Sequence, residues 1–130
     1  MKDIRISTVN ISLHASLNDT HTAEEIGKIL PIKEKVNVWG QEIYFTIPAK
    51  IGLEPDATAD VDVGTIAYWP EGPALCIFFG PTPVSTGSKP RAYSPVNIIG
   101  RTIEDPAILK VVPDGAEIII EQFKGEERIR

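Results

Sequence analysis

The sequence predicts a mainly β fold, built as a small closed or nearly closed barrel. Short apolar runs rich in Ile, Val, Phe, Tyr and Trp recur along the chain, and turn signals containing Gly, Pro, Asn or Asp separate them at close spacing. One amphipathic stretch has the spacing of a helix. A chain of 130 residues, 42% of them apolar, is long enough to bury one core, so we expect a single domain over residues 1–130.

The amino-terminal residues 4–17 alternate apolar and polar side chains, which is typical of β-strands. Ile4 and Ile6 set one phase, and a second phase runs from Val9 to Leu17. The change of phase between these two stretches predicts a turn or a bulge.

A short helix is expected next, over residues 23–30. Thr22 and Glu25 have the spacing of a capping box, in which the two side chains satisfy backbone amides at the start of a helix. Pro31 ends the helix, because the residue before a proline is pushed out of the helical conformation. We expect this helix to cover one end of the sheet.

Two hairpins form the centre of the predicted fold. The first spans residues 36–47 and turns at Gly40-Gln41, and the second spans residues 65–79 and turns at the Pro-Glu-Gly-Pro sequence of residues 70–73. Alternation in the first hairpin puts Ile43, Phe45 and Ile47 on one face and Glu42, Tyr44 and Thr46 on the other.

Residues 49–59 and 80–94 lack periodicity and contain prolines, so both are expected to be loops. The second loop is long for a small domain, which favours a functional role. A strand is expected over residues 96–101.

The carboxyl-terminal part is predicted to hold a helical turn and a final strand. Asp105 is followed by a proline, a pattern typical of a helix start, so residues 107–111 should form a helical turn. Residues 117–122 contain three consecutive isoleucines and are expected inside the sheet rather than at its edge.

The charge and the apolar runs limit the classes of partner. A net charge of −5 disfavours nucleic acid and anionic membrane surfaces, and no apolar run approaches the ~20 residues that a membrane-spanning helix needs. The first residues lack the apolar core of a signal peptide. We therefore expect a cytoplasmic protein with no nucleic-acid or membrane partner.

The sequence offers no evident cofactor or metal site. His14 and His21 are the only histidines, fewer than the three or four ligands that zinc takes, and no glycine-rich phosphate-binding motif is present. Cys76 is the only cysteine and lies in an apolar run, where a small buried side chain is expected. No cofactor and no metal are predicted.

Aromatic residues supply the candidate site. Six aromatic side chains come from the two hairpins as candidates: Trp39, Tyr44, Tyr68, Trp69, Phe78 and Phe79. One face of each strand must point out of a barrel. If Trp69 packs inside, then Tyr68 faces outward. An outer aromatic groove bordered by the proline-rich loop would bind a peptide or a small apolar ligand. Its predicted ligand-binding residues are Trp39, Tyr44, Tyr68, Phe79, Arg91, Tyr93 and Asn97.

Three stretches of the chain, NVWGQEIYFTIP (residues 37–48), GTIAYWPEGPALCIFFGPTP (residues 64–83) and SPVNIIGR (residues 94–101), resemble the small prokaryotic cyclophilin-like proteins of the TM1367 type, a domain family of unknown function. The resemblance runs from about residue 4 to residue 122. It implies a closed eight-stranded β-barrel like that of cyclophilin, in an abbreviated form.

Three functions follow as alternatives. The first is a binding module for an extended or proline-containing peptide, or for a small apolar ligand, in the aromatic groove. The second, implied by the resemblance, is a peptidyl-prolyl isomerase, with Arg91 as the catalytic residue, although the cyclophilin sequence around its catalytic arginine is not found here. The third is an assembly role, in which exposed aromatic residues form a homo-oligomer contact.

Overall fold

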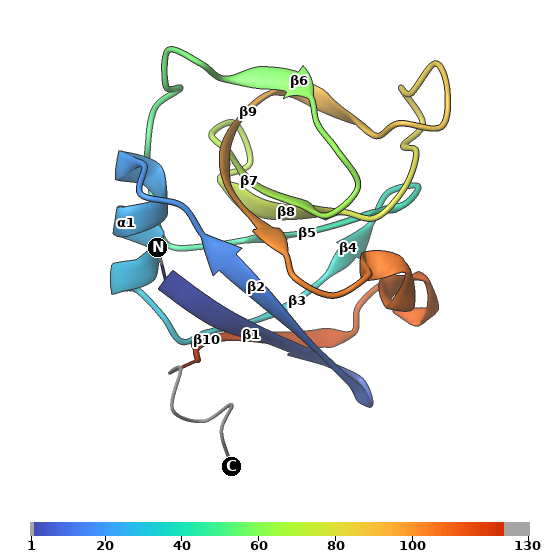
Figure 1. Cartoon of the computed structure of the whole chain (residues 1–130), viewed down its shortest axis with the longest axis horizontal. Coiled ribbons are helices and arrows are strands. Elements are labelled where there is room, and N and C mark those ends of the chain that lie inside the picture. Colours follow the sequence, from blue (N-terminus) through green and yellow to red (C-terminus); the bar gives the residue numbers. More distant parts are fainter. Residues whose placement is uncertain (1, 124–130) are drawn as a thin grey trace.

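A computed structural model describes residues 2–123, and the expected domain of residues 1–130 extends beyond this part at both ends. The described part holds ten strands, one α-helix and one 3-10 helix (Figure 1). The strands are β1 (Lys2–Thr8), β2 (Ile11–Leu17), β3 (Ile32–Lys35), β4 (Asn37–Val38), β5 (Glu42–Thr46), β6 (Thr58–Asp60), β7 (Thr65–Trp69), β8 (Ala74–Phe78), β9 (Arg91–Thr102) and β10 (Glu117–Gln122). The helices are α1 (His21–Lys28) and η1 (Pro106–Val111).

The strands form one strongly curved sheet that does not close. Its order is β3-β10-β1-β2-β9-β7-β8-β5-β4, and β6 pairs with β9 beside this path. The prediction of a closed eight-stranded barrel is therefore wrong in both strand number and closure, while the mainly β class is confirmed. The two edge strands, β3 and β4, are adjacent in the chain and are separated only by Val36.

The amino-terminal segment folds as a hairpin, as the change of phase predicts. β1 and β2 pair antiparallel from Lys2 opposite Leu17 to Thr8 opposite Ile11, so the turn lies at Val9 and Asn10. Ile4, Ile6, Leu13 and Ala15 point into the core.

The helix begins earlier than predicted. Thr20 caps α1, because its side chain accepts a hydrogen bond from the Ala23 amide at 3.2 Å, and the helix ends at Lys28 rather than at residue 30. Thr22 is therefore not the capping residue. It lies fully buried inside the first turn, and its hydroxyl donates a hydrogen bond to Glu54.

Two apolar clusters lie on opposite faces of the β5–β8–β7 layer. The main core is on one face and contains Ile43, Phe45, Tyr68 and Ile77 together with residues of β1, β2, β10 and α1. A smaller cluster on the other face contains Val61, Ala67, Cys76, Phe78, Ala92 and Val96, with Tyr44 and Trp69 packed against it. Both faces of this layer are thus covered.

Strand β9 creates the second cluster by bending over the layer. Its carboxyl-terminal half pairs with β2 and β7, and its amino-terminal half pairs with β6 (Figure 1). The pairing with β7 shifts register between Ile66 and Ala67, a bulge that increases the local bend. The expected loop of residues 80–94 is therefore shorter than predicted, because residues 91–94 already belong to this strand.

The carboxyl-terminal predictions are confirmed. Asp105 caps η1 by accepting a hydrogen bond from the Ala107 amide at 2.9 Å. β10 lies between β3 and β1 in the interior of the sheet, with Ile118 and Ile120 buried. Within residues 2–123, no helix is long and apolar enough to cross a bilayer.

Candidate functional site

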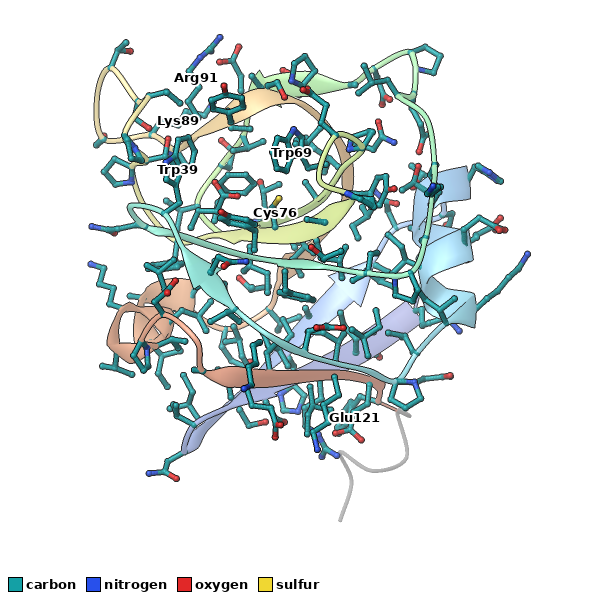
Figure 2. All side chains as sticks on the ribbon, turned by 180° about the vertical axis from the view of Figure 1, so that it is seen from behind. Trp39, Trp69, Cys76, Lys89, Arg91 and Glu121 are labelled. Atoms are coloured by element: carbon teal, nitrogen blue, oxygen red, sulfur yellow. The ribbon has the colours of Figure 1, made fainter. Side chains whose placement is uncertain are left out.

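A cavity of about 220 Å³ opens on the second cluster, beneath the bent half of β9. We call it the aromatic pocket. Figure 2 shows Trp39 and Trp69 near Cys76, with Arg91 and Lys89 above them and Glu121 at the opposite end of the molecule. The pocket is lined by Trp39, Glu42, Tyr44, Trp69, Cys76, Ala92, Tyr93 and Val96.

Four aromatic rings form the walls in an edge-to-face series. The Tyr93 ring lies 6.0 Å from the Trp39 ring and 6.0 Å from the Trp69 ring, at interplanar angles of 72° and 75°. The Trp69 ring lies 6.4 Å from that of Tyr44 at 85°. Such contacts are favourable between aromatic quadrupoles, and the four rings together line a cavity that opens to solvent at Tyr93.

Hydrogen bonds fix the orientation of Trp69. Its indole Nε1 donates to the Ser94 hydroxyl at 2.7 Å, and that hydroxyl donates to a carboxylate oxygen of Glu71 at 2.6 Å. Glu71 lies in the β7–β8 turn and Ser94 in β9. This chain of contacts ties the pocket wall to both elements.

A tight turn positions Trp39 and Glu42. The two residues exchange backbone hydrogen bonds at 2.9 and 3.2 Å, which leaves Gly40 and Gln41 as the two-residue turn. Gly40 has a φ of +59°, and a Cβ there would lie 2.7 Å from Pro83 Cδ, so glycine is required on both counts. The predicted turn at these residues is confirmed.

Glu42 is the unusual polar group of the pocket. Its side chain is only 5% exposed, and its Oε1 atom is buried without a hydrogen-bond partner among residues 2–123. Burial raises the pKa of Glu42 to about 7, and a hydrogen bond from the Cys76 thiol opposes part of that rise. Burial and the Glu42 carboxylate raise the pKa of the Cys76 thiol, so this cysteine is not an activated nucleophile.

Three of the predicted binding residues line the aromatic pocket: Trp39, Tyr44 and Tyr93. They come from the β4–β5 hairpin and from β9, which the sequence separates by about fifty residues and the bend of β9 brings together. Tyr93 is 69% exposed at the mouth, whereas Trp39 and Tyr44 are half-buried.

Tyr68 and Phe79 lie elsewhere. Tyr68 is fully buried in the main core, where its hydroxyl donates to the Ala49 carbonyl at 2.7 Å and accepts from the Ile51 amide at 3.1 Å. Phe79 is also part of the main core. The inference that Tyr68 faces outward when Trp69 packs inside is wrong, because Trp69 is the member of this pair that lines the pocket.

Asn97, which lies in β9, anchors a neighbouring loop through its side-chain hydrogen bonds. Its side-chain oxygen accepts from the Glu54 amide at 2.8 Å, and its amide nitrogen donates to the Gly52 carbonyl at 2.9 Å and to Thr22 Oγ1 at 3.1 Å. The side chain is 1% exposed and does not line the pocket. It holds residues 52–54 against α1 and β9.

Arg91 does not line the pocket either. It lies at the start of β9, and its guanidinium donates to the Asp60 carboxylate at 2.6 Å. This exposed ion pair gives Arg91 a partner away from the pocket, so the structure adds nothing in favour of a catalytic role for it.

Glu42, Trp69 and Cys76 also line the pocket, although they are not among the binding residues predicted from the sequence. The available signal for Glu42 was its phase: it alternates with Tyr44 on the face opposite Ile43 and Phe45. A carboxylate on an aromatic strand face is a candidate whenever that face is covered by another element. Among residues 2–123, no group of three or more His, Cys, Asp or Glu side chains is placed to hold a metal ion.

Comparisons with known proteins identify the fold. A sequence model of the cyclophilin-like family matches residues 2–121. The solution structure of the hypothetical protein AF2241 from Archaeoglobus fulgidus is similar, with a TM-score of 0.79 and 36% identity over 94% of this chain and 95% of that one. The structure of McbB in complex with tryptophan has a TM-score of 0.69 and 18% identity, covering 94% of this chain and 45% of that one.

A search of curated proteins found no significant match. The family match covers almost all of the described residues, and the archaeal protein shares more than a third of its residues over nearly its whole length. The chain therefore belongs to the cyclophilin-like family.

Proposed function

We propose that this protein is a binding module that holds a small ligand, or one side chain of an extended or proline-containing peptide, in the aromatic pocket. The observation that carries the proposal is the enclosure of a cavity by four rings in edge-to-face contact. Ligand sites are typically apolar concave surfaces with a few fixed polar groups, which is the composition of this pocket.

The size of the pocket limits the occupant. A volume of about 220 Å³ is below the roughly 300–1,000 Å³ of pockets that enclose drug-sized molecules. The occupant is therefore a compact molecule or a single side chain. McbB, 45% of which this chain matches in fold, was solved in complex with tryptophan, which makes a small aromatic molecule a suitable occupant to test. Within the family, the three sequence strings support placing this chain with the TM1367-type proteins.

Two-dimensional NMR of labelled protein tests the proposal. The probes are indole, phenol, 3,3-dimethylbutan-1-ol, choline and a short proline-containing peptide with one aromatic residue. We expect at least one probe to shift the resonances of Ala92, Tyr93 and Val96 with a saturable dependence on concentration, and Trp69→Ala to abolish the shift because it removes a wall of the pocket.

Val63→Ala is the matched control, since Val63 is an exposed apolar side chain outside the pocket and its truncation should leave the shifts unchanged. The proposal fails if none of the probes perturbs the pocket resonances. It also fails if sedimentation shows a stable dimer that Tyr93→Ala dissociates, because the pocket mouth would then be a subunit contact.

A further inference from the structure

We propose that the aromatic pocket takes an organic ammonium group, with the buried Glu42 carboxylate as its counter-charge and the surrounding rings as its walls. This inference rests on the proposed binding function and names the class of ligand. Three observations support it: an unsatisfied carboxylate oxygen, the arrangement of the rings and the distribution of charge around the pocket.

The first observation is the unsatisfied oxygen of Glu42. A buried acceptor without a donor carries a free-energy cost, which is larger when the acceptor is charged. Oε1 of Glu42 has no partner within residues 2–123, although the residue lines the pocket and is 95% buried. A ligand that brings an N–H donor or a positive charge removes this cost, which a purely apolar ligand does not.

The second observation is the arrangement of the rings. A cation is attracted to the faces of Trp and Tyr when it lies within about 6 Å of the ring centroids, and aromatic enclosures are a common way of holding quaternary ammonium groups. Trp39, Tyr93 and Trp69 are linked at 6.0 Å with near-perpendicular planes. Because Trp69 is held by Ser94, this enclosure is present before a ligand arrives.

The third observation is the distribution of charge around the pocket. No lysine, arginine or histidine is among its lining residues in the described chain. The nearby cations are paired with carboxylates that do not line the pocket: Arg91 pairs with Asp60 at 2.6 Å, and Lys89 pairs with Asp62 at 3.3 Å. Within residues 2–123 no cation lines the pocket beside Glu42, and an anionic ligand would meet a carboxylate without a counter-charge from this part of the chain.

A metal ion is a poorer occupant than an organic cation. Ca²⁺ takes six to eight oxygen ligands and Mg²⁺ prefers octahedral oxygen coordination, whereas the pocket offers one carboxylate and hydrophobic walls. An alkylammonium group satisfies both parts of the site, because its charge pairs with Glu42 and its methyl or methylene groups contact the rings.

The experiment compares choline with 3,3-dimethylbutan-1-ol, its uncharged carbon analogue of nearly the same shape. Both tryptophans of the chain line the pocket, so the intrinsic fluorescence reports directly on occupancy. At pH 8 and constant ionic strength, we expect choline to bind at least tenfold more tightly than the alcohol. Glu42→Gln should weaken choline binding about tenfold or more and leave binding of the alcohol unchanged.

Glu121→Gln is the matched control, because it removes the same charge from a half-buried carboxylate, paired with Arg5 at 3.5 Å, at the opposite end of the molecule (Figure 2). It should leave both affinities unchanged. Retained binding of the alcohol by Glu42→Gln shows that the variant folds. If that variant loses both ligands, Glu42→Asp, which keeps the charge, should restore choline binding.

Equal binding of choline and the alcohol, or a choline affinity that Glu42→Gln does not lower, overturns the ammonium assignment. The binding function would survive either result, since the pocket would still take a neutral ligand. Failure of every probe in the NMR series would instead remove the binding function itself.

Discussion

At the scale of single residues, Glu42 shows how one side chain can conflict with its surroundings. Residues with buried charges are normally paired, and each exception in a folded protein calls for a physical explanation. Here the carboxyl sits between the apolar layer of β5 and β8 and the rings above it, with the Cys76 thiol as a weak donor. In the part of the chain that the structure describes, the Glu42 Oε1 atom therefore has no hydrogen-bond donor.

This arrangement predicts a pH-dependent cost in stability. The ordinary pKa of the Glu42 carboxyl is 4.5 and its value in the folded protein is about 7. Between these values the folded state keeps a proton that the unfolded state has released, so Glu42 lowers the free energy of unfolding as the pH rises through this range. The loss is complete above pH 7 and amounts to roughly 3 kcal/mol.

Glu42→Gln should remove this dependence. Relative to wild type, we expect the variant to gain about 2–3 kcal/mol in free energy of unfolding between pH 4 and pH 8, measured by urea denaturation at both pH values. The other titratable groups of the pocket are Tyr44, Tyr93 and Cys76, and the raised pKa of the Cys76 thiol keeps it uncharged over this interval. Glu121→Gln serves as control and should show no comparable gain; a flat difference for Glu42→Gln would contradict the prediction.

At the scale of elements, the close approach of β2 and β9 depends on a glycine. Gly100 pairs with Leu17, and a Cβ at this position would lie 2.2 Å from the Ser16 carbonyl oxygen. Backbone cannot give way as a flexible side chain can. We expect Gly100→Ala to lower the free energy of unfolding by about 2–4 kcal/mol.

Gly87→Ala provides the comparison for this change, since a Cβ there meets no atom within 4 Å. It should alter the free energy of unfolding by less than about 0.5 kcal/mol. Thermal and urea unfolding of both variants would decide the point, and a mild effect at Gly100 would mean that β2 and β9 separate more easily than their register implies.

The elements also show which predictions the sequence supports. The hairpins and the capped turn η1 follow from local signals: turn residues, alternation and Asp105 before a proline. The orientation of β7 cannot be derived from local signals, because its residues Thr65–Tyr68 are all buried. When both faces of a strand are covered, alternation no longer says which face meets the main core. The expectation of an outward Tyr68 and an inward Trp69 is wrong for this reason: Tyr68 lies in the main core and Trp69 lines the pocket.

Short, charged edge strands are a second feature that the sequence does not predict. β3 has the sequence Ile-Lys-Glu-Lys and only one of these residues is buried, so the sequence alone does not indicate a strand. The segment is recognised as a strand only from its pairing with β10. Charged edge strands of this kind protect a sheet against pairing with other chains. The candidate site was only partly predictable. Trp39 and Tyr44 belong to a hairpin with several aromatic residues and Tyr93 borders the proline-rich loop, whereas Glu42 becomes notable only when β9 covers it.

At the scale of the whole molecule, the sheet depends on contacts between distant parts of the chain. β10 is bound on one side to β1 and on the other to β3, and it buries Ile118 and Ile120. Loss of a buried isoleucine typically costs about 2–5 kcal/mol, while a domain of this kind has a total stability of roughly 5–15 kcal/mol.

A chain that ends at Val112, before β10, should therefore fail to fold. We expect it to lack a cooperative thermal transition in circular dichroism and to show poorly dispersed amide resonances in NMR spectra. A chain that ends at Phe123 keeps every described ladder and should unfold cooperatively. Cooperative unfolding of the shorter chain would show that the β5–β8–β7–β9 part is stable by itself.

The open sheet has a consequence for selectivity. Trp39 directly follows β4, an edge strand that pairs with β5 alone within the described residues, whereas Tyr44, Cys76 and Trp69 stand on interior strands. Tyr93, 69% exposed, lies in the half of β9 that pairs with β6, so two of the four rings, Trp39 and Tyr93, stand on weakly paired segments of the described chain. Larger ligands of one series should therefore be accommodated by displacement of the Trp39 and Tyr93 rings, while Tyr44 and Trp69 keep their positions.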